Sequence, residues 1–132
     1  MIEILDTRFF NAHYGSGDTS TWGKTREKLS RLRRERRGRI PSIVVAEVAH
    51  ILCVEAGRRE ALAQVRAMEQ YGLEVVALDS GIASAAGILK CMHRELPIAD
   101  CIIAATALQA GGCVVTDDPH FRRIEGLRVT WI

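Results

Sequence analysis

The sequence predicts an α/β fold, a three-layer sandwich in which a short-stranded and mainly parallel central sheet is flanked by helices. Short apolar runs typical of buried strands alternate with longer helix-like segments along the whole chain, and this alternation is typical of parallel sheets. The run Cys113–Thr116 is apolar up to its last residue, as expected of a strand covered on both faces. The chain has 132 residues and no visible linker or repeat, so residues 1–132 are expected to form one domain.

Apolar runs and N-cap residues define the predicted elements of the N-terminal half. Residues 18–21 offer several N-caps for a helix with few apolar positions, which is expected to be largely solvated. The run from Ile43 to Leu52 is rich in β-branched residues, but it extends to Glu55, and this length favours a buried helix with Ser42 as its N-cap. In order, we expect a strand at 2–5, a helix from 7 to a break at 15–17, a helix from 22 to about 37 that Gly38 ends, a short strand at 39–42, and helices at 43–55 and about 59–71.

Glycine and proline separate the predicted elements of the C-terminal half. Leu96-Pro97 divides two helices, and the second of them consists of small apolar residues and ends at Gly111-Gly112. In order, we expect a strand at 73–78, a helix from Asp79-Ser80 to about 93, a helix at 99–108, a strand at 113–116, a loop at 117–121 and an edge strand at 127–132.

Charge is nearly balanced over the whole chain but unevenly distributed along it. The 18 Lys and Arg residues against 16 Asp and Glu leave a net charge of +2. Between Lys24 and Arg39 there are nine basic and two acidic residues, or +7, which leaves −5 for the rest of the chain. Such a segment either forms a solvated helix face or binds phosphate groups, in which case its affinity for nucleic acid falls as the salt concentration rises. Sequence-specific reading of bases is not indicated, because Trp22 is the only aromatic residue nearby. The candidate nucleic-acid-binding residues are Arg8 and, within this segment, Arg33, Arg34, Arg36 and Arg37.

Composition indicates a folded cytoplasmic protein. Hydrophobic residues make up 48% of the chain and charged residues 26%, which excludes global disorder. No apolar run approaches the ~18 residues needed to cross a bilayer, and Glu3 is an acid where a signal peptide would be basic. No membrane partner is therefore expected. The cysteines lie in apolar stretches without CxxC spacing and are expected to be small buried side chains; they are Cys53, Cys91, Cys101 and Cys113.

Acidic residues follow two of the predicted strands at the point where each strand ends. Asp6 comes directly after the first strand, and Asp117-Asp118 comes directly after the strand at 113–116. Because ligands of parallel sheets collect outside the carboxyl ends of the strands, these acids are expected to share one edge. Asp100 lies in the first turn of its helix, where the helix dipole favours a carboxylate, and Glu47 is an acid within an apolar helix.

Each acid also has a purely structural interpretation. Asp6 suits a cap at a strand end, Asp100 a helix N-terminus, Glu47 an ion pair with an arginine, and one acid before Pro119 a turn. Together, however, several carboxylates near one sheet edge repel one another unless a cation lies among them. Hard oxygen ligands without Cys or His spacing suit Mg²⁺ or Mn²⁺ rather than zinc.

Four stretches, taken in order, resemble the PIN domain family, a fold shared by many small prokaryotic ribonucleases that include VapC-type toxins. They are Leu5-Asp6-Thr7, Ser42–Glu47, Leu96–Ala107 and Val114–Phe121, and the last two are the most specific. The resemblance covers essentially the whole chain. It implies that Asp6, Glu47, Asp100 and Asp118 are catalytic residues that bind metal, that Thr116 supports the metal site, and that Asp117 bonds to the ligands rather than to the metal.

Arg8 departs from the family pattern, since the second residue after the first acid is usually Ser or Asn. Arg8 is expected either to modify the metal site or to contact a phosphate of the substrate. The resemblance implies a Mg²⁺- or Mn²⁺-dependent endoribonuclease that hydrolyses RNA phosphodiester bonds, as the toxin of a toxin–antitoxin pair. The alternative is a non-catalytic PIN-like module that binds nucleic acid or a partner protein.

The family resemblance also implies a homodimer and an antitoxin protein as partner. Apolar helix faces around Ile51, Leu52, Leu62 and Val65 are candidates for such interfaces, but burial in the core explains the same residues equally well.

Overall fold

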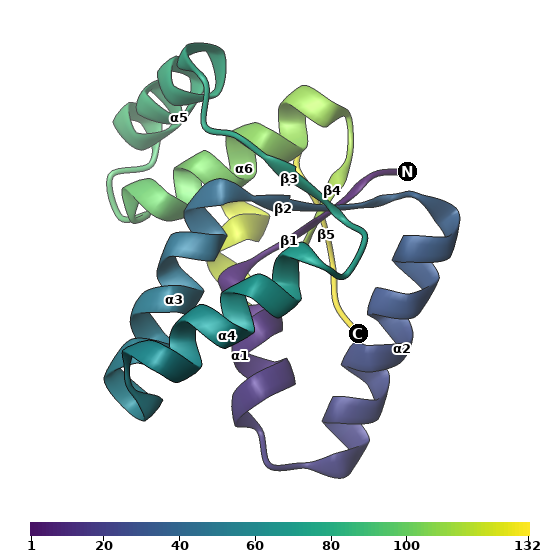
Figure 1. Ribbon diagram of the computed structural model, residues 1–132. Helices are drawn as coiled ribbons and strands as arrows, with labels where there is room; N and C mark the ends of the chain where they lie inside the picture. The colour runs from purple at the N-terminus through teal and green to yellow at the C-terminus, as the bar shows by residue number, and fades with distance from the viewer.

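Five short strands form one parallel sheet in the order β3-β2-β1-β4-β5 in the computed structural model, which describes residues 1–132 (Figure 1). Every pairing is parallel, and β1 lies between β2 and β4 at the centre. The predicted α/β class is therefore confirmed, with the last strand at an edge. The strands are β1 (Glu3–Leu5), β2 (Gly38–Pro41), β3 (Glu74–Val76), β4 (Cys113–Val115) and β5 (Arg128–Thr130).

Six helices cover the two faces of the sheet and complete the three layers. The chain moves from β1 to β2 to β3 in one direction and then crosses back to β4, so right-handed connections place the helices of the last crossover on the opposite face. Figure 1 shows α5 and α6 on one side of the sheet and α1, α2 and α4 on the other. The helices are α1 (Thr7–Gly15), α2 (Thr19–Glu35), α3 (Ser42–Ala56), α4 (Arg58–Glu69), α5 (Ser80–Met92) and α6 (Ile98–Ala110), with a 3₁₀ turn at Pro119–Arg123.

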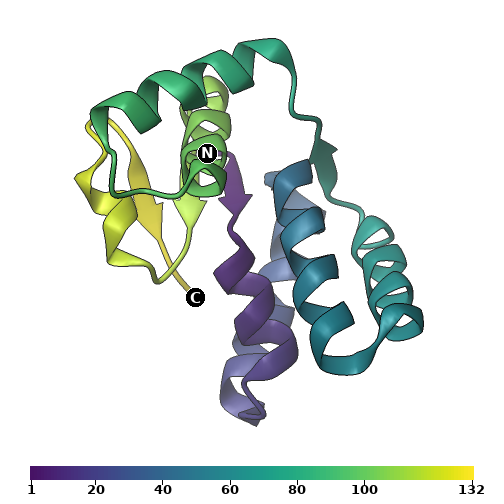
Figure 2. The ribbon, with the colours of Figure 1, turned by 90° about the vertical axis from the view of Figure 1, so that its left-hand side faces the viewer.

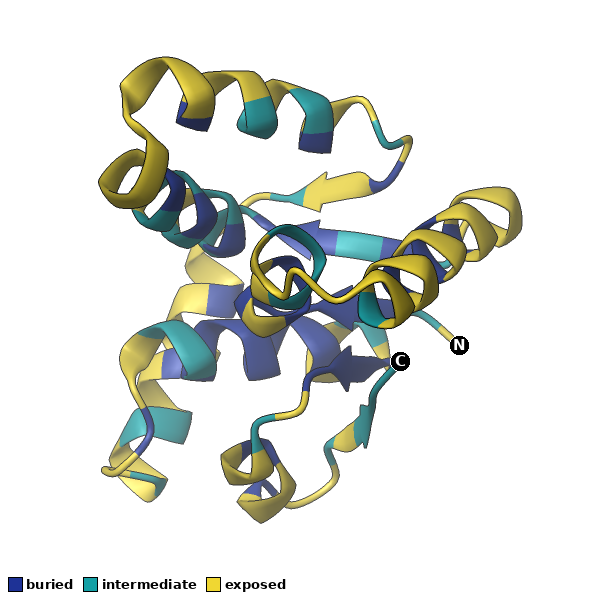
Figure 3. Ribbon diagram, turned by 90° about the horizontal axis from the view of Figure 1, so that it is seen from below, coloured by how far each residue is buried: buried dark blue, intermediate teal, exposed yellow.

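The core lies around the central strands and α6. Figure 3 shows the buried residues gathered along the sheet and on the helix faces that meet it. All seven residues of 101–107 in α6 are buried, and Phe9 and Phe10 of α1 are inaccessible to solvent. Close approach of β1 and β4 requires Gly112, because a Cβ there would lie 2.2 Å from the Ile2 carbonyl oxygen. This packing holds the carboxyl ends of β1 and β4 side by side.

Two helix ends differ from the sequence-based expectation. The residue that ends α2 is Arg36, which adopts the left-handed conformation (φ 53°) and donates its backbone N–H to carbonyls of the last turn. Gly38 instead begins β2, where a Cβ would lie 2.9 Å from Leu32 and Leu73. Ser42 does not cap α3; the N-cap is Pro41, and the Ser42 hydroxyl accepts a hydrogen bond from the Leu78 N–H (3.1 Å).

The expectation that all four cysteines are buried was wrong for two of them. Cys101 and Cys113 are buried, whereas Cys53 on α3 and Cys91 on α5 are exposed. Both helices are apolar beyond the face that meets the core, so an apolar stretch there does not imply burial. None of the helices combines the length and hydropathy needed to cross a bilayer.

Candidate active site

Asp6 lies where β1 passes into α1, a junction visible in Figure 2. It is the N-cap of α1, and its Oδ1 accepts a hydrogen bond from the Thr7 N–H (2.8 Å). Its own N–H donates to the Val115 carbonyl at the end of β4 (3.2 Å). β2 and β3 follow on one side of β1 and β4 lies on its other side, so the order in which strands are added reverses here. Such a switch point is where α/β sheets bind ligands.

Thr116 connects Asp6 to Asp118. Its hydroxyl donates to Asp6 Oδ2 (2.6 Å) and accepts from the Asp118 N–H (3.0 Å). Thr116 is the residue directly after β4, so the parallel register of β1 and β4 places its hydroxyl beside Asp6. The structure thus brings Thr116, Asp6 and Asp118 together as the sequence predicted.

Glu47 reaches the same place from α3. Its Oε1 accepts a hydrogen bond from the Thr7 hydroxyl (2.7 Å), which ties α3 to the first turn of α1. Sequence reasoning overlooked Thr7, although a hydroxyl residue next to the first acid was visible in the sequence. Thr7 thus contributes its backbone N–H to Asp6 and its side chain to Glu47.

Asp100 joins the group from the first turn of α6. Partial burial, together with the charges of Asp6, Asp118 and Glu47, raises the pKa of Asp100 to about 7. Burial also raises the pKa of Asp6, against the opposing effect of its bonds to Thr116 and Thr7, and the charges of Glu47 and Asp118 add to the rise. The charges of Glu47 and Asp118 act on both Asp6 and Asp100, as expected of four carboxylates that lie near one another at the carboxyl ends of β1 and β4. We call Asp6, Glu47, Asp100 and Asp118 the acid rim.

The acid rim fits a hard divalent cation in the kind of its donors. All four side chains offer carboxylate oxygens, and a cation among them would offset the charge repulsion that adds to burial in raising the pKa of Asp100. In this structure no three of these side chains lie close enough together to coordinate one ion. Mg²⁺ needs only one or two protein carboxylates, since it keeps several of its waters. Asp6, Glu47, Asp100 and Asp118 are the side chains that would hold such an ion.

Two further polar pairs border the acid rim. Arg8, in the first turn of α1, forms an exposed ion pair with Asp117. The partner of Asp117 in this structure is therefore the Arg8 guanidinium and not a side chain of the acid rim. The second pair joins Asp118 and His120, and nothing in the sequence pattern had indicated a role for His120. Asp118 Oδ1 accepts from the His120 N–H (2.9 Å) and lies 2.8 Å from its Nδ1.

Arg33, Arg34, Arg36 and Arg37, which were predicted to bind nucleic acid, lie near the amino end of β1, whereas the acid rim lies at its carboxyl end. α2 ends beside the amino end of β1, where the Arg37 carbonyl accepts from the Glu3 N–H (2.8 Å), and β1 spans about 10 Å before the acid rim begins. Arg37 is engaged by Glu35 and Glu3. Arg33, Arg34 and Arg36 form no ion pair; we call these three residues the basic edge.

Thr116→Val is expected to lower divalent-metal affinity and activity by roughly 10- to 100-fold, the usual cost of losing a group that orients a ligand. Valine has the same shape as threonine but cannot donate to Asp6 or accept from the Asp118 N–H. Titration of Mn²⁺ into the protein by calorimetry measures the loss directly. Thr116→Ser, which keeps the hydroxyl, is the matched control and should bind Mn²⁺ as the parent does; equal affinity of the valine variant would contradict the role of the hydroxyl.

Comparison with known proteins supports the fold described above. A family model described as PIN domain matches residues 4–127, whereas none of the curated proteins matches the chain. The fold is similar to VapBC2 from Rickettsia felis bound to a DNA fragment from its promoter (19% identity, TM-score 0.79, covering 100% of this chain and 99% of that chain). It is also similar to DNA-bound VapBC from Salmonella typhimurium (25%, 0.78, 99% and 98%). A third similar structure is Mycobacterium tuberculosis VapC20, described as a sarcin–ricin loop cleaving toxin (20%, 0.71, 92% and 93%).

Proposed function

Because the chain belongs to the PIN domain family, we propose that it is an endoribonuclease that hydrolyses RNA phosphodiester bonds with Mg²⁺ or Mn²⁺ as its cofactor. The observation that carries the proposal is the acid rim, in which Thr116 and Thr7 link Asp6 to Asp118 and Glu47, and in which burial and the neighbouring charges raise the pKa of Asp100 to about 7. Negative charges that repel one another are stabilised by a divalent cation among them. A bound cation in turn attracts the negatively charged phosphodiester of a nucleic acid. When bound, the ion makes water a better nucleophile and stabilises charge on the phosphoryl group.

The chain's own residues orient the reactants in this proposal. Thr116 and the Thr7 N–H hold the two oxygens of Asp6 in place, and the Thr7 hydroxyl holds Glu47. Positioning of this kind lowers the barrier because the reacting groups need little rearrangement. Arg8 lies next to the acid rim and is exposed, so a substrate phosphate can displace Asp117 as its partner.

The test is cleavage of a purified RNA in the presence of Mg²⁺ or Mn²⁺. We expect cleavage with either ion, no cleavage in EDTA, and recovery when excess ion is added back. A DNA strand of the same sequence serves as the comparison substrate and should stay intact. Cleavage of RNA that continues unchanged in EDTA would overturn the assignment of the metal, and cleavage of DNA alone that of the substrate.

We further propose that the protein is the toxin of a toxin–antitoxin pair and acts in the cytoplasm. The support is the similarity over nearly the full length to proteins of VapBC complexes. A cavity of about 460 Å³ between α1 and α3 has apolar walls that include Val48, Ile51 and Leu52, and it suits an apolar antitoxin segment. Leu52 itself is 9% exposed and belongs mainly to the core, whereas Leu62 on α4 is 54% exposed.

A homodimer is the second part of this proposal. α5 and α6 expose Ile88, Met92 and Leu108 along a cavity-bearing apolar face. A second copy of the chain is the partner proposed for that face, and sedimentation velocity of the free protein tests it. A monomer at all concentrations would contradict the dimer.

A non-catalytic module that binds RNA or a partner protein is the second candidate function. It is favoured by the Arg8–Asp117 ion pair beside the acid rim and by the absence of a three-ligand group in this structure. The measurement that distinguishes the two functions is calorimetric titration with Mg²⁺ and Mn²⁺. Retained RNA affinity without any divalent-ion binding at millimolar concentration would favour the non-catalytic function.

Replacement of the basic edge by glutamine (Arg33, Arg34 and Arg36 together) is expected to weaken RNA binding and to reduce its salt dependence. Each phosphate contact that is lost lowers the slope of log affinity against log salt by roughly 0.7 for a single strand. Because the basic edge lies opposite the acid rim, cleavage at saturating RNA should be unchanged. The control is the same substitution of three exposed arginines on α4, Arg58, Arg59 and Arg66. If the control alters the slope as much, the effect is one of net charge and not of the basic edge.

A further inference from the structure

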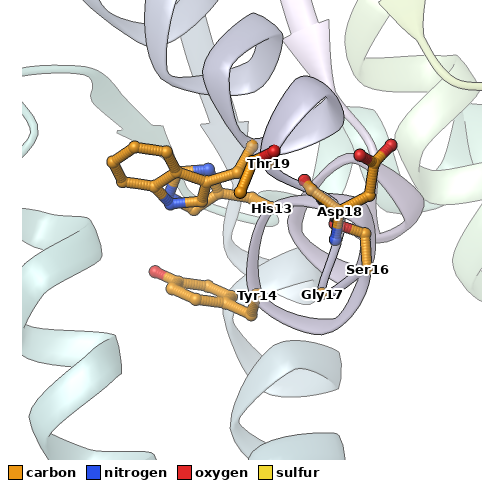
Figure 4. A pocket seen from close by; sticks show the side chains of 7 residues that line it. His13, Tyr14, Ser16, Gly17, Asp18 and Thr19 are labelled. Carbon is orange, nitrogen blue, oxygen red and sulfur yellow. Dashed lines mark hydrogen bonds between the residues drawn. The ribbon is translucent and has the colours of Figure 1, made fainter.

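The hairpin between α1 and α2 contains a cavity of about 250 Å³ that the proposed reaction does not use. It is lined by His13 and Tyr14 from the last turn of α1, by residues 16–19 of the connecting loop, and by Trp22 from α2. Figure 4 shows the side chains of His13 and Tyr14 on one side of this cavity and the loop residues on the other. Trp22 is 45% exposed, so part of its indole can be reached by a ligand.

Aromatic rings and a cation line this region together. The His13 imidazole and the Trp22 indole lie within 16° of parallel, with 6.4 Å between ring centroids. The Arg26 guanidinium lies 5.1 Å from the centroid of the same indole. An exposed indole next to a guanidinium is the combination with which single-stranded nucleic acids are held, because the ring stacks on a base while the cation meets a phosphate.

Hydrogen bonds within the protein leave one acceptor in this region available to a ligand. The Tyr14 and Tyr71 hydroxyls bond to each other (2.7 Å), so Tyr14 offers mainly its ring. The Thr25 hydroxyl donates to the Trp22 carbonyl (3.0 Å), so at the 2.8 Å contact with His13 it is Nδ1–H that donates to Thr25. Burial lowers the pKa of His13, which keeps the ring neutral and makes Nε2 an acceptor. Nε2 has no partner in the protein and is open to solvent, since no buried side-chain nitrogen or oxygen is unpaired.

We propose that this cavity binds one nucleobase of single-stranded RNA, away from the bond that is cleaved. The inference rests on the proposed function and adds a substrate contact to it. α1 begins at Asp6 and carries His13 seven positions later, so the cavity lies about 10 Å along the helix from the acid rim. Every RNA base has a π face for stacking and at least one N–H that can donate to His13 Nε2. The site therefore accepts any of the four bases.

The experiment compares two ligands and four proteins. A fluorescently labelled short oligo(A) and an abasic ribose–phosphate chain of the same length are titrated with protein in EDTA, where no cleavage takes place. The proteins are the parent, Trp22→Ala, Trp22→Phe and the control Val54→Ala, which truncates a side chain that is 74% exposed on α3. Thermal unfolding of each variant verifies that it is folded.

We expect Trp22→Ala to bind oligo(A) about tenfold more weakly than the parent does, the usual order for one lost base stack. Its affinity for the abasic chain should be unchanged, Trp22→Phe should keep most of the parent's affinity, and Val54→Ala should match the parent with both ligands. Equal weakening for both ligands would overturn the inference, because the effect would then be on phosphate contacts. An unchanged affinity of Trp22→Ala for oligo(A) would also overturn it, while cleavage by the parent would leave the proposed function standing. A parent that binds neither ligand would overturn the inference, and cleavage with Mg²⁺ or Mn²⁺ would still decide the proposed function separately.

Discussion

Asp100→Asn is expected to lower RNA cleavage at least about a hundredfold, because a metal ligand or charge that stabilises the transition state contributes several kcal/mol. The same substitution should make the metal-free protein more stable. The negative charges of Asp6, Asp118 and Glu47 act against a charge on Asp100, whose pKa they raise together with burial to about 7. Asparagine removes that charge and keeps the shape. Activity and stability should therefore change in opposite directions.

The pH dependence of unfolding checks the physical reason. The pKa of Asp100 is higher in the folded protein, about 7, than its ordinary value of 3.8, so the folded state retains a proton between these values. Stability in EDTA should therefore fall as pH rises from about 4 to 7 and remain low above it. The carboxyl is partly exposed, so the contribution is about 1–2 kcal/mol, or a few degrees in Tm. Asp100→Asn should lack this part of the decline.

Glu69→Gln is the matched control for Asp100, since Glu69 is an exposed acid on α4 far along the chain from the acid rim. It should leave both cleavage and the pH dependence of unfolding as they are in the parent. Full activity of Asp100→Asn would contradict the assignment of Asp100 to the site. Loss of activity together with lower stability at pH 8 would instead indicate that the substitution damages the fold.

Lys28→Met is expected to cost about 3 kcal/mol of unfolding free energy, the largest effect on stability that we predict. Lys28 and Glu3 form a salt bridge of 2.7 Å with side chains only 7% and 8% exposed. The Lys28 ammonium also donates to the Trp131 carbonyl (3.4 Å), so it joins the first strand, α2 and the C-terminal segment. Methionine fills the space but leaves the Glu3 carboxylate buried with only Arg37, at 3.6 Å, as a cation nearby.

Denaturant unfolding measures this loss, and a double variant isolates its cause. Glu3→Leu combined with Lys28→Met should recover most of the stability, because no charge then remains buried. Arg39→Gln breaks an exposed ion pair with Glu74 and should cost less than about 1 kcal/mol. A loss for Lys28→Met no greater than that of Arg39→Gln would show that burial of the Glu3 charge is not what makes the pair important.

The order and type of the secondary structure could be predicted because local patterns and the core agree in this chain. The apolar runs that form β1 and β4 are short and are followed by acids. The segment of α3 was predicted to be a helix and not a strand only because of its length. Helix ends were less predictable. Arg36 ends α2 in a conformation that favours glycine, because Gly38, two residues later, is needed where β2 packs against Leu32 and Leu73.

The proximity of Asp6 and Asp118 was predictable because the parallel arrangement places residues that follow strands at one end of the sheet, whereas Glu47 and Asp100 lie on helices and were grouped with them only through the family resemblance. Asp6 and Thr116 each follow a strand directly, and their hydrogen bond is a consequence of the β1–β4 register. Contacts between side chains of separate elements, such as Thr7 with Glu47, have no pattern in the sequence. The location of the basic edge and the cavity beside Trp22 likewise depend on how α2 folds back along α1, which charge and hydropathy do not encode.

The continuity of α1 has a consequence for the spacing between its two ends. An α-helix has a fixed rise and rotation per residue. Asp6 is the N-cap of α1, and His13 in its last turns lines the cavity. Inserting one residue within α1 would move the cavity by about 1.5 Å along the axis and turn it by about 100° relative to the acid rim. An insertion in the loop at 16–17 would leave that spacing almost unchanged. The number of residues in α1 therefore sets the distance and the rotation between the acid rim and the cavity, whereas the length of the loop that follows α1 does not affect them.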